Sequence, residues 1–178
     1  MSSPIFDTAP DFDQPIAVLK HCHDRIRKQL TTLQELPPHL AQHGSDAQAR
    51  QAAVAVLRYF EQAAPNHHAD EEQDLLPMLH ACAIDADAQL LEQLVPDILH
   101  EHVQMEAAWQ TLARQLRHVA DGSASELAGG DVRQFVDLYT GHMEKEEAHI
   151  APMAKRLFDA AQMAQLGLAM KKRRNIDT

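Results

Sequence analysis

Hydrophobic residues recur every three or four positions along most of the chain, which is the spacing of one face of an α-helix. No stretch shows a convincing alternation with the period of two that a half-buried strand requires. The predicted long helices span residues 13–36, 45–82, 85–121 and 131–159. Four amphipathic helices of this length predict an all-α, antiparallel up-down four-helix bundle.

Prolines, glycines and capping residues set the expected boundaries of these helices. Pro37-Pro38 is expected to end the first helix, and Pro65 is expected to bend the second. Residues 122–130 form the clearest loop. Asp159 followed by Gln162 predicts a capping box at the start of a short fifth helix.

The chain of 178 residues has the length of one domain. We expect a flexible tail over residues 1–12, a bundle domain over 13–159, and a short helix with a basic tail over 160–178. The basic run at 171–174 stands at the end of that last helix, where basic side chains complement the helix dipole. Contact with an anionic partner is the alternative role for this run.

Each predicted long helix carries a titratable residue on its buried face. The hydrophobic spacing leaves one gap in the first helix and one in the third, and histidines fill both. The second and fourth helices each have a histidine followed four residues later by a glutamate. These six residues are His23, His67, Glu71, His102, His142 and Glu146.

The second and fourth helices share the longer motif His-x3-Glu-Glu-x4-Pro, which begins at His67 and again at His142. The copies lie 75 residues apart, and His23 and His102 lie 79 apart, so the chain is interpreted as two similar helical hairpins. A bundle with this pseudo-symmetry brings all six groups to one level of its core. A histidine and a glutamate four residues apart lie one above the other and can converge on one ion.

Four imidazoles and two carboxylates suit two metal ions, each with two histidines and both glutamates as bridges. Such a site leaves positions open for water, an oxo or hydroxo bridge, or a small gas. Imidazole and carboxylate ligands with open positions suit non-haem iron, whereas structural zinc is usually closed by four ligands that include cysteine. The alternative is that histidine–glutamate ion pairs neutralise the buried groups without a metal.

The histidine of the CHDRI segment, the two HxxxEExxxxP segments and the EH pair of the third helix resemble the hemerythrin-like (HHE cation-binding) family. The resemblance covers roughly residues 13–158 and implies the hemerythrin-like bundle with two non-haem iron ions. It agrees with the choice of His102 over His100. The ligands it implies, with both glutamates as bridges, are His23, His67, Glu71, His102, His142 and Glu146.

The sequence departs from the oxygen-carrying hemerythrins at two positions. Their second histidine on the third helix corresponds to Glu106 here, which is either an extra ligand or an acceptor for a ligand imidazole. Their aspartate on the fourth helix corresponds to Glu147, directly after Glu146. The chain therefore resembles the bacterial branch of the family, which has fewer histidine ligands.

The neighbours of the candidate ligands are given weaker roles. His68 is expected to point about 100° away from His67, toward the surface or behind the ligands. Glu72 and Glu147 are expected to accept hydrogen bonds from ligand imidazoles or to be solvated. Cys22 adjoins His23 but lacks the Cys-x-x-Cys spacing of a redox motif.

Composition excludes several classes of function. The net charge of −10, from 26 acidic and 16 basic residues, disfavours nucleic-acid binding. No apolar run is long enough to cross a membrane, and the first residues lack the features of a secretory signal. Two cysteines are too few for a disulfide scaffold and indicate a reduced, cytoplasmic protein.

Three kinds of function remain. The first is the binding or sensing of O₂, NO or other small oxidants at the di-iron centre, by a monomer or a homodimer. The second is an enzyme that reduces peroxide or NO, or that donates iron in the repair of iron–sulfur clusters. The third is a regulatory or structural bundle that its metal stabilises. Whether the protein is an enzyme is left open, and binding of a small oxidant is the first expectation.

Overall fold

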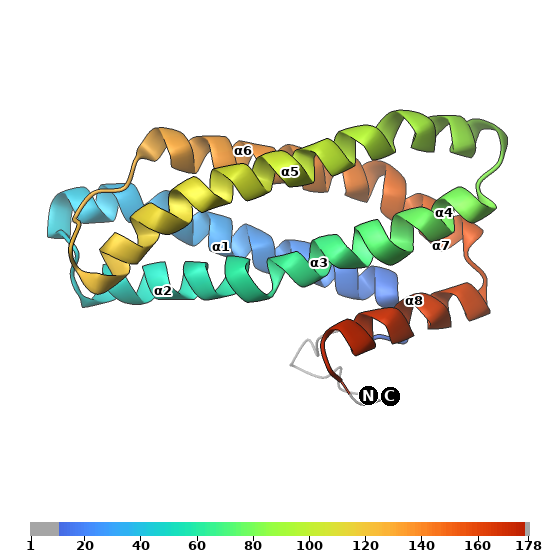
Figure 1. Cartoon of the computed structure of the whole chain (residues 1–178), viewed down its shortest axis with the longest axis horizontal. Coiled ribbons are helices and arrows are strands. Elements are labelled where there is room, and N and C mark those ends of the chain that lie inside the picture. The colour runs from blue at the N-terminus through green and yellow to red at the C-terminus, as the bar shows by residue number, and fades with distance from the viewer. Residues whose placement is uncertain (1–10, 177–178) are drawn as a thin grey trace, which may run out of the picture.

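The computed structural model describes residues 11–176, and no strand occurs among them. Four helical rods run antiparallel along the long axis, and a fifth helix packs beside one end (Figure 1). This confirms the predicted antiparallel bundle with a C-terminal helix. The elements are α1 (Pro15–His43), α2 (Ala47–Gln62), α3 (Ala64–Asp70), the π-helical turn η1 (Glu71–Leu75), α4 (Leu76–Cys82), α5 (Asp85–Asp121), α6 (Gly129–Lys145), the π-helical turn η2 (Glu146–Ile150), α7 (Ala151–Leu157) and α8 (Ala160–Arg173).

The rods pack in a ring. Helix α1 contacts α2 and α6, and helix α5 contacts the same two helices from the opposite side. The second rod consists of α2, α3, η1 and α4, and the fourth consists of α6, η2 and α7. Every rod therefore presents one face to a common interior.

Helix α1 continues through Pro37-Pro38 to His43, so the predicted end at these prolines is wrong. Each proline removes a backbone donor, but the hydrophobic stripe continues across them with helical spacing. Leu36 and Leu40 are buried in the core on either side of the prolines. Packing of this stripe outweighs the lost hydrogen bonds, and the helix ends at Gly44, whose φ of 65° favours glycine.

Other predicted boundaries are confirmed. The second rod is interrupted between α2 and α3 at Ala63, directly before Ala64 and Pro65. Helix α2 is capped by Asp46, whose carboxylate accepts from the Ala49 amide at 2.8 Å. The capping box at Asp159 and Gln162 is present at the start of α8.

The motif repeat produces two π-helical turns that the sequence analysis did not predict. In η1 the amide of Leu76 donates to the Glu71 carbonyl five residues back, and in η2 the amide of Ala151 donates to the Glu146 carbonyl. The next residue in each copy is the motif proline, which has no amide hydrogen and whose ring crowds the preceding turn. A wider turn at this point accommodates the proline.

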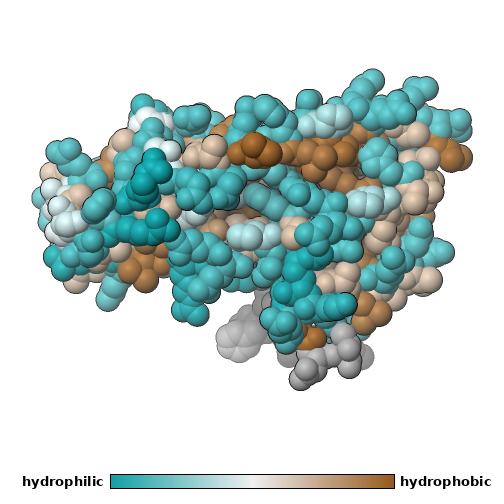
Figure 2. Space-filling model, in the orientation of Figure 1, coloured by the Kyte–Doolittle hydropathy of each residue, from teal (hydrophilic) through white to brown (hydrophobic). Residues whose placement is uncertain are grey.

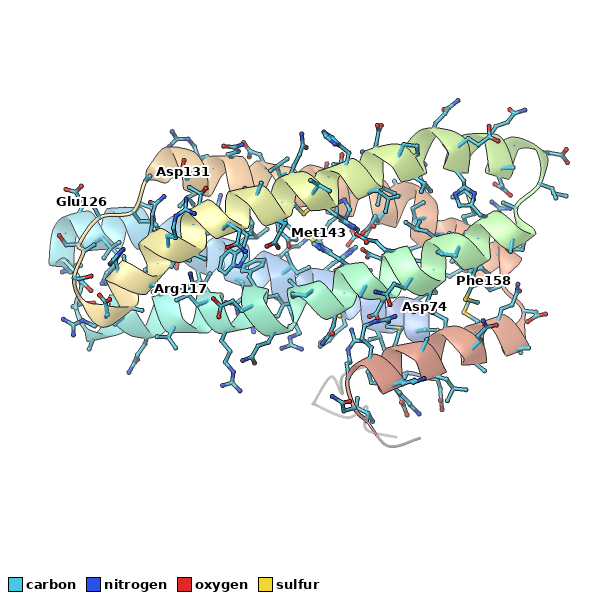
Figure 3. All side chains as sticks on the ribbon, viewed as in Figure 1. Asp74, Arg117, Glu126, Asp131, Met143 and Phe158 are labelled. Carbon is cyan, nitrogen blue, oxygen red and sulfur yellow. The ribbon has the colours of Figure 1, made fainter. Side chains whose placement is uncertain are left out.

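The apolar core consists of two parts separated by a polar layer. One part, which includes Met143 in the interior of the bundle, is formed by α1, α2, α5 and α6 (Figure 3). The other is formed by the beginning of α1 and of α5 together with α4, α7 and α8. His23 lies between Leu19 of the second part and Ile26 of the first. The candidate ligands occupy this dividing layer.

Polar residues cover most of the face shown in Figure 2, while hydrophobic residues gather along α5. None of the helices among residues 11–176 is apolar over a length that could span a bilayer. Residues 1–10 of the predicted tail lie outside the described residues. Phe12 is half-buried, and its carbonyl oxygen passes so close to Gly167 of α8 that a Cβ at this glycine would overlap it.

Candidate metal centre

The structure brings all six predicted ligands together in the layer between the two apolar parts of the core. Each rod supplies at least one of them, and none is more than 5% exposed. His23 comes from α1 and His102 from α5. In the other two rods the histidine lies in the last turn of a regular helix and the glutamate is the first residue of the π-helical turn.

Each glutamate reaches histidines of two different rods. Glu71 places Oε1 at 3.1 Å from Nε2 of His67 and Oε2 at 3.4 Å from Nε2 of His102. Glu146 places Oε1 at 3.4 Å from Nε2 of His142 and Oε2 at 3.2 Å from Nε2 of His23. The two carboxylates therefore link the two halves of the cluster.

The ligand atoms form two overlapping groups. One comprises His23, His67, Glu71 and Glu146, and the other comprises Glu71, His102, His142 and Glu146. Within each group one ligand atom from every residue lies within 4.8 Å of the others. Two positions that share both glutamates match the geometry of two ions with bridging carboxylates.

Several of these atoms are buried and have no hydrogen-bond partner among residues 11–176. They are Nε2 of His23, both ring nitrogens of His67, Oε2 of Glu71 and both oxygens of Glu146. Buried polar atoms are rarely left in this state, because each one has lost its water without a replacement. Nitrogen and carboxylate oxygen atoms that converge in this way fit a metal ion with hard or borderline character.

Three of the histidines are oriented from behind by carboxylates. Nδ1 of His23 lies 2.9 Å from Oε1 of Glu147, and Nδ1 of His102 lies 2.6 Å from Oε1 of Glu72. Nδ1 of His142 lies 3.0 Å from Oε2 of Glu101. A carboxylate at Nδ1 fixes the proton there and leaves the Nε2 lone pair directed at the centre.

The π-helical turns explain how adjacent glutamates of each motif serve one cluster. Neighbouring residues on a regular helix do not face each other. A π-helical turn has more residues per turn and therefore a smaller angle between neighbours. Glu71 enters the cluster and Glu72 contacts His102 directly behind it, and Glu146 and Glu147 repeat this arrangement.

The pKa values of the ionisable groups in the cluster are shifted in different directions. Burial and the nearby Glu146 raise the pKa of Glu71 well above its usual value. Burial also acts to raise the pKa of Glu146, but His142 and His23 hold it below the usual value. Burial and His23 lower the pKa of His67, so this imidazole is neutral and ready to bind a cation.

The family model of the hemerythrin HHE cation-binding domain matches residues 14–154. The chain belongs to this family. A relative described as an uncharacterized protein, from Haemophilus influenzae, is 26% identical over 165 residues, which cover 93% of this chain and 92% of that protein. The residues that the family model matches contain both motif copies as well as His23 and His102, and hence all six residues of the buried cluster of this HHE domain.

Glu101 is an acceptor that the sequence analysis of the HHE domain missed. It precedes His102 by one residue but contacts His142, and it also forms an ion pair with Lys145 at 2.5 Å. The repeat gave no hint of this acceptor, because Cys22 occupies the matching position before His23. Among the described residues, Nδ1 of His67 accordingly has no acceptor.

His68 lies closer to the centre than its position beside His67 suggested. Its ring stacks on that of His102, with 4.1 Å between centroids and 13° between planes. One nitrogen from each of His68, His102 and His142 lies within 4.8 Å of the others. Nε2 of His68 is buried and has no partner in the part of the chain that the structure describes. The expected location behind the ligands is thus correct, and the expected location on the surface is wrong.

Two other candidates lie away from the cluster. Glu106 is exposed and accepts a hydrogen bond from Nε2 of Gln110 at 2.6 Å. It joins neither of the two ligand groups. His100 is also exposed, in keeping with the choice of His102 as the ligand of α5.

The basic end of α8 binds acidic residues of this chain. Asp70, fully buried between His67 and Glu71, forms ion pairs with Arg173 and with Arg174, the latter at 2.6 Å. Arg173 also lies 2.6 Å from Asp74, on the side of η1 that faces α8 (Figure 3). The expected role of this run, to complement the helix dipole, is therefore incomplete.

Proposed function

We propose that this HHE domain holds two non-haem iron ions and binds or senses O₂, NO or related small oxidants. The observation that carries the proposal is the pair of buried ligand groups that share Glu71 and Glu146. Each ion would have two histidines and two bridging carboxylates. This leaves part of a six-coordinate shell free, as a centre that binds small molecules requires.

Iron bound in this way would supply reversible electron exchange with a small oxidant. The chain's own residues prepare the site for it. Carboxylates at Nδ1 of His23, His102 and His142 keep the proton away from the ligand nitrogen. The apolar residues on both sides of the layer restrict the access of bulk water to it.

Access to the centre favours a small-molecule function over a purely structural metal. A cavity of about 280 Å³ opens from the surface between α1 and α7 and reaches His23, Glu71 and Glu146. A structural ion is usually fully enclosed by its ligands and needs no such opening. The cavity therefore supports binding of a molecule beside the ions.

The first experiment is the metal content per chain of protein produced with iron available, followed by absorption spectra. We expect about two irons per chain and near-ultraviolet and visible bands that disappear on reduction. The substitution His100→Ala changes an exposed histidine of the same helix and should leave both quantities unchanged. Zinc, a single ion or no metal would contradict the proposal.

The same sample distinguishes binding from catalysis. After reduction, exposure to O₂ or NO should give a stable new spectrum if the protein binds the gas. Repeated turnover, with consumption of peroxide or NO in excess over protein, would instead indicate the reductase function. Loss of iron to an acceptor protein during the assay would indicate iron donation.

A further inference from the structure

The cavity between α1 and α7 has features that a passage for a diatomic gas does not require. Its volume of about 280 Å³ far exceeds the ~30 Å³ that one water molecule occupies in the liquid. Its walls are largely apolar and include Ile16, Leu19, Leu75 and Ile150. A molecule with an extended apolar body would replace water along these walls favourably.

Two lysines stand at the opening of this cavity. Lys20 of α1 and Lys155 of α7 both line it, and both are exposed. Neither has a carboxylate within ion-pair distance among residues 11–176, whereas Lys145 is paired with Glu101. Glu147 also lines the opening, but its carboxylate is already paired with Arg27 and His23. The opening therefore offers two uncompensated positive charges in a chain of net charge −10.

A second cavity, between α3 and α5, reaches the same centre but has different side chains at its opening. It has a volume of about 340 Å³ and is lined by His68, His102 and aromatic residues. Glu106 and Glu72, the latter paired with His102, also line it, and no lysine or arginine among residues 11–176 does. Of these two openings, the one between α1 and α7 therefore offers cationic groups to an anion, and the other does not.

We propose that the α1–α7 cavity binds a small organic monoanion, with its apolar body along the cavity walls and its anionic group at Lys20 and Lys155. The inner end of the molecule would then lie beside His23, Glu71 and Glu146. This placement rests on the proposed function only in that the ions would lie at the inner end. The recognition itself depends on the walls and the lysines, which are present without metal.

The experiment uses octanoate as the probe and octanamide as a neutral molecule of the same shape. Binding is measured by calorimetry at one ionic strength, with the metal-free and the metal-loaded chain. We expect octanoate to bind both forms more tightly than octanamide does. The double substitution Lys20→Gln/Lys155→Gln should weaken octanoate roughly five- to tenfold and leave octanamide unchanged, as the loss of two exposed ion pairs implies.

Two further variants serve as controls. Lys28→Gln removes an exposed lysine of α1 that does not line the cavity and should leave octanoate binding unchanged. Ala151→Phe fills the cavity and should weaken both probes. Higher salt should weaken octanoate more than octanamide, because salt screens the lysines.

Several results would overturn the inference. Equal affinity for the two probes would show that the charge is not recognised. A loss in Lys28→Gln equal to that in the double variant would show a general effect of net charge. Octanoate that binds only the metal-loaded chain, and is unaffected by the double substitution, would show a carboxylate bound to metal instead. Metal analysis of each sample separates these results from a failure of the di-iron proposal.

Discussion

The two copies of the His-x3-Glu-Glu-x4-Pro motif hold the same ligand atoms but are fixed in the bundle by different means. Three residues after its histidine, the first copy has Asp70, which is fully buried and clamped by Arg173 and Arg174 of α8. At the same place the second copy has Lys145, which is partly exposed and pairs with Glu101 of α5. The first copy is thus anchored to the C-terminal helix and the second to the bundle itself.

This difference distinguishes the residues that form the cluster from the residues that hold its helices in place. The ligands, the glutamates that follow them and the π-helical turns are repeated, because each serves the cluster directly. The anchoring residues are not repeated, since any contact that fixes the helix is sufficient. A buried carboxylate without a partner is costly, so Asp70 makes the first copy dependent on α8.

Loss of a bridging glutamate should have the largest effect and should be equal for the two copies. Glu71→Ala and Glu146→Ala each remove a carboxylate that belongs to both ligand groups. We expect each variant to lose at least one of its two ions, measured as metal content per chain.

His68→Ala is the control for these variants. Its ring lies behind His102 and supplies no bridging oxygen, so both ions should be retained. Equal metal content in all three variants would contradict the ligand assignment. Loss of one ion from His68→Ala alone would make His68 a ligand.

The anchoring residues should differ in their effect on stability. Asp70→Ala removes a fully buried carboxylate that pairs with two partly buried arginines, and it should lower the free energy of unfolding by about 3 kcal/mol. Lys145→Ala breaks a partly exposed pair and should lower it by less than about 1 kcal/mol. Denaturant unfolding of the metal-free proteins measures both values, and similar losses would show that the burial of Asp70 is not decisive.

The residues one position before the ligands of α1 and α5 provide a sharper comparison. Glu101→Gln weakens the acceptor of His142 and should reduce metal affinity by about 10- to 100-fold. Cys22→Ser changes the corresponding residue of the other half, where no described residue accepts from Nδ1 of His67, and should have little effect. Competition with a chelator of known affinity measures both. If Cys22→Ser lost as much metal affinity as Glu101→Gln, the predicted difference between these two positions would be wrong.

The smallest expected effect is on the pH dependence of the metal-free protein. Burial and His23 lower the pKa of His67 well below its ordinary value. Burial also lowers the pKa of His142, but Glu146 and Glu101 oppose this shift. The unfolded chain takes up a proton near pH 6.5 that folded His67 does not, so stability falls as the pH drops below that value.

The free energy of unfolding of the parent protein should therefore fall between pH 7.5 and 5.5. In His67→Gln this fall should be smaller by about 1 kcal/mol. His142→Gln should reduce the fall by less. The raised pKa of Glu71 gives a slope of the opposite sign, because the folded protein takes up that proton first. The measurement is therefore the unfolding free energy at both pH values for each variant and for the parent protein. Equal changes in His67→Gln and His142→Gln would contradict the predicted difference between the two histidines.

The amino-acid sequence alone determined the bundle and the six residues of its polar layer. Helical spacing is local, so the gaps at His23 and His102 could be recognised without any knowledge of the fold. The repeat then required the two motif copies to face each other at one level. Residues of the same helix face, four positions apart, needed no further information to be placed together.

Contacts between residues far apart in the chain follow from the packing of the rods and not from local spacing. Helix α1 passes through Pro37-Pro38 because the core stabilises Leu36 and Leu40. Glu101 contacts His142 rather than its neighbour His102, and Arg174 contacts Asp70 across 104 residues. Such pairs depend on how the rods are rotated about their axes and aligned along them. Hydrophobic spacing does not specify this, because many packed cores are compatible with the same spacing. The sequence pattern therefore specifies which side chains face inward, while packing selects the partners they meet there.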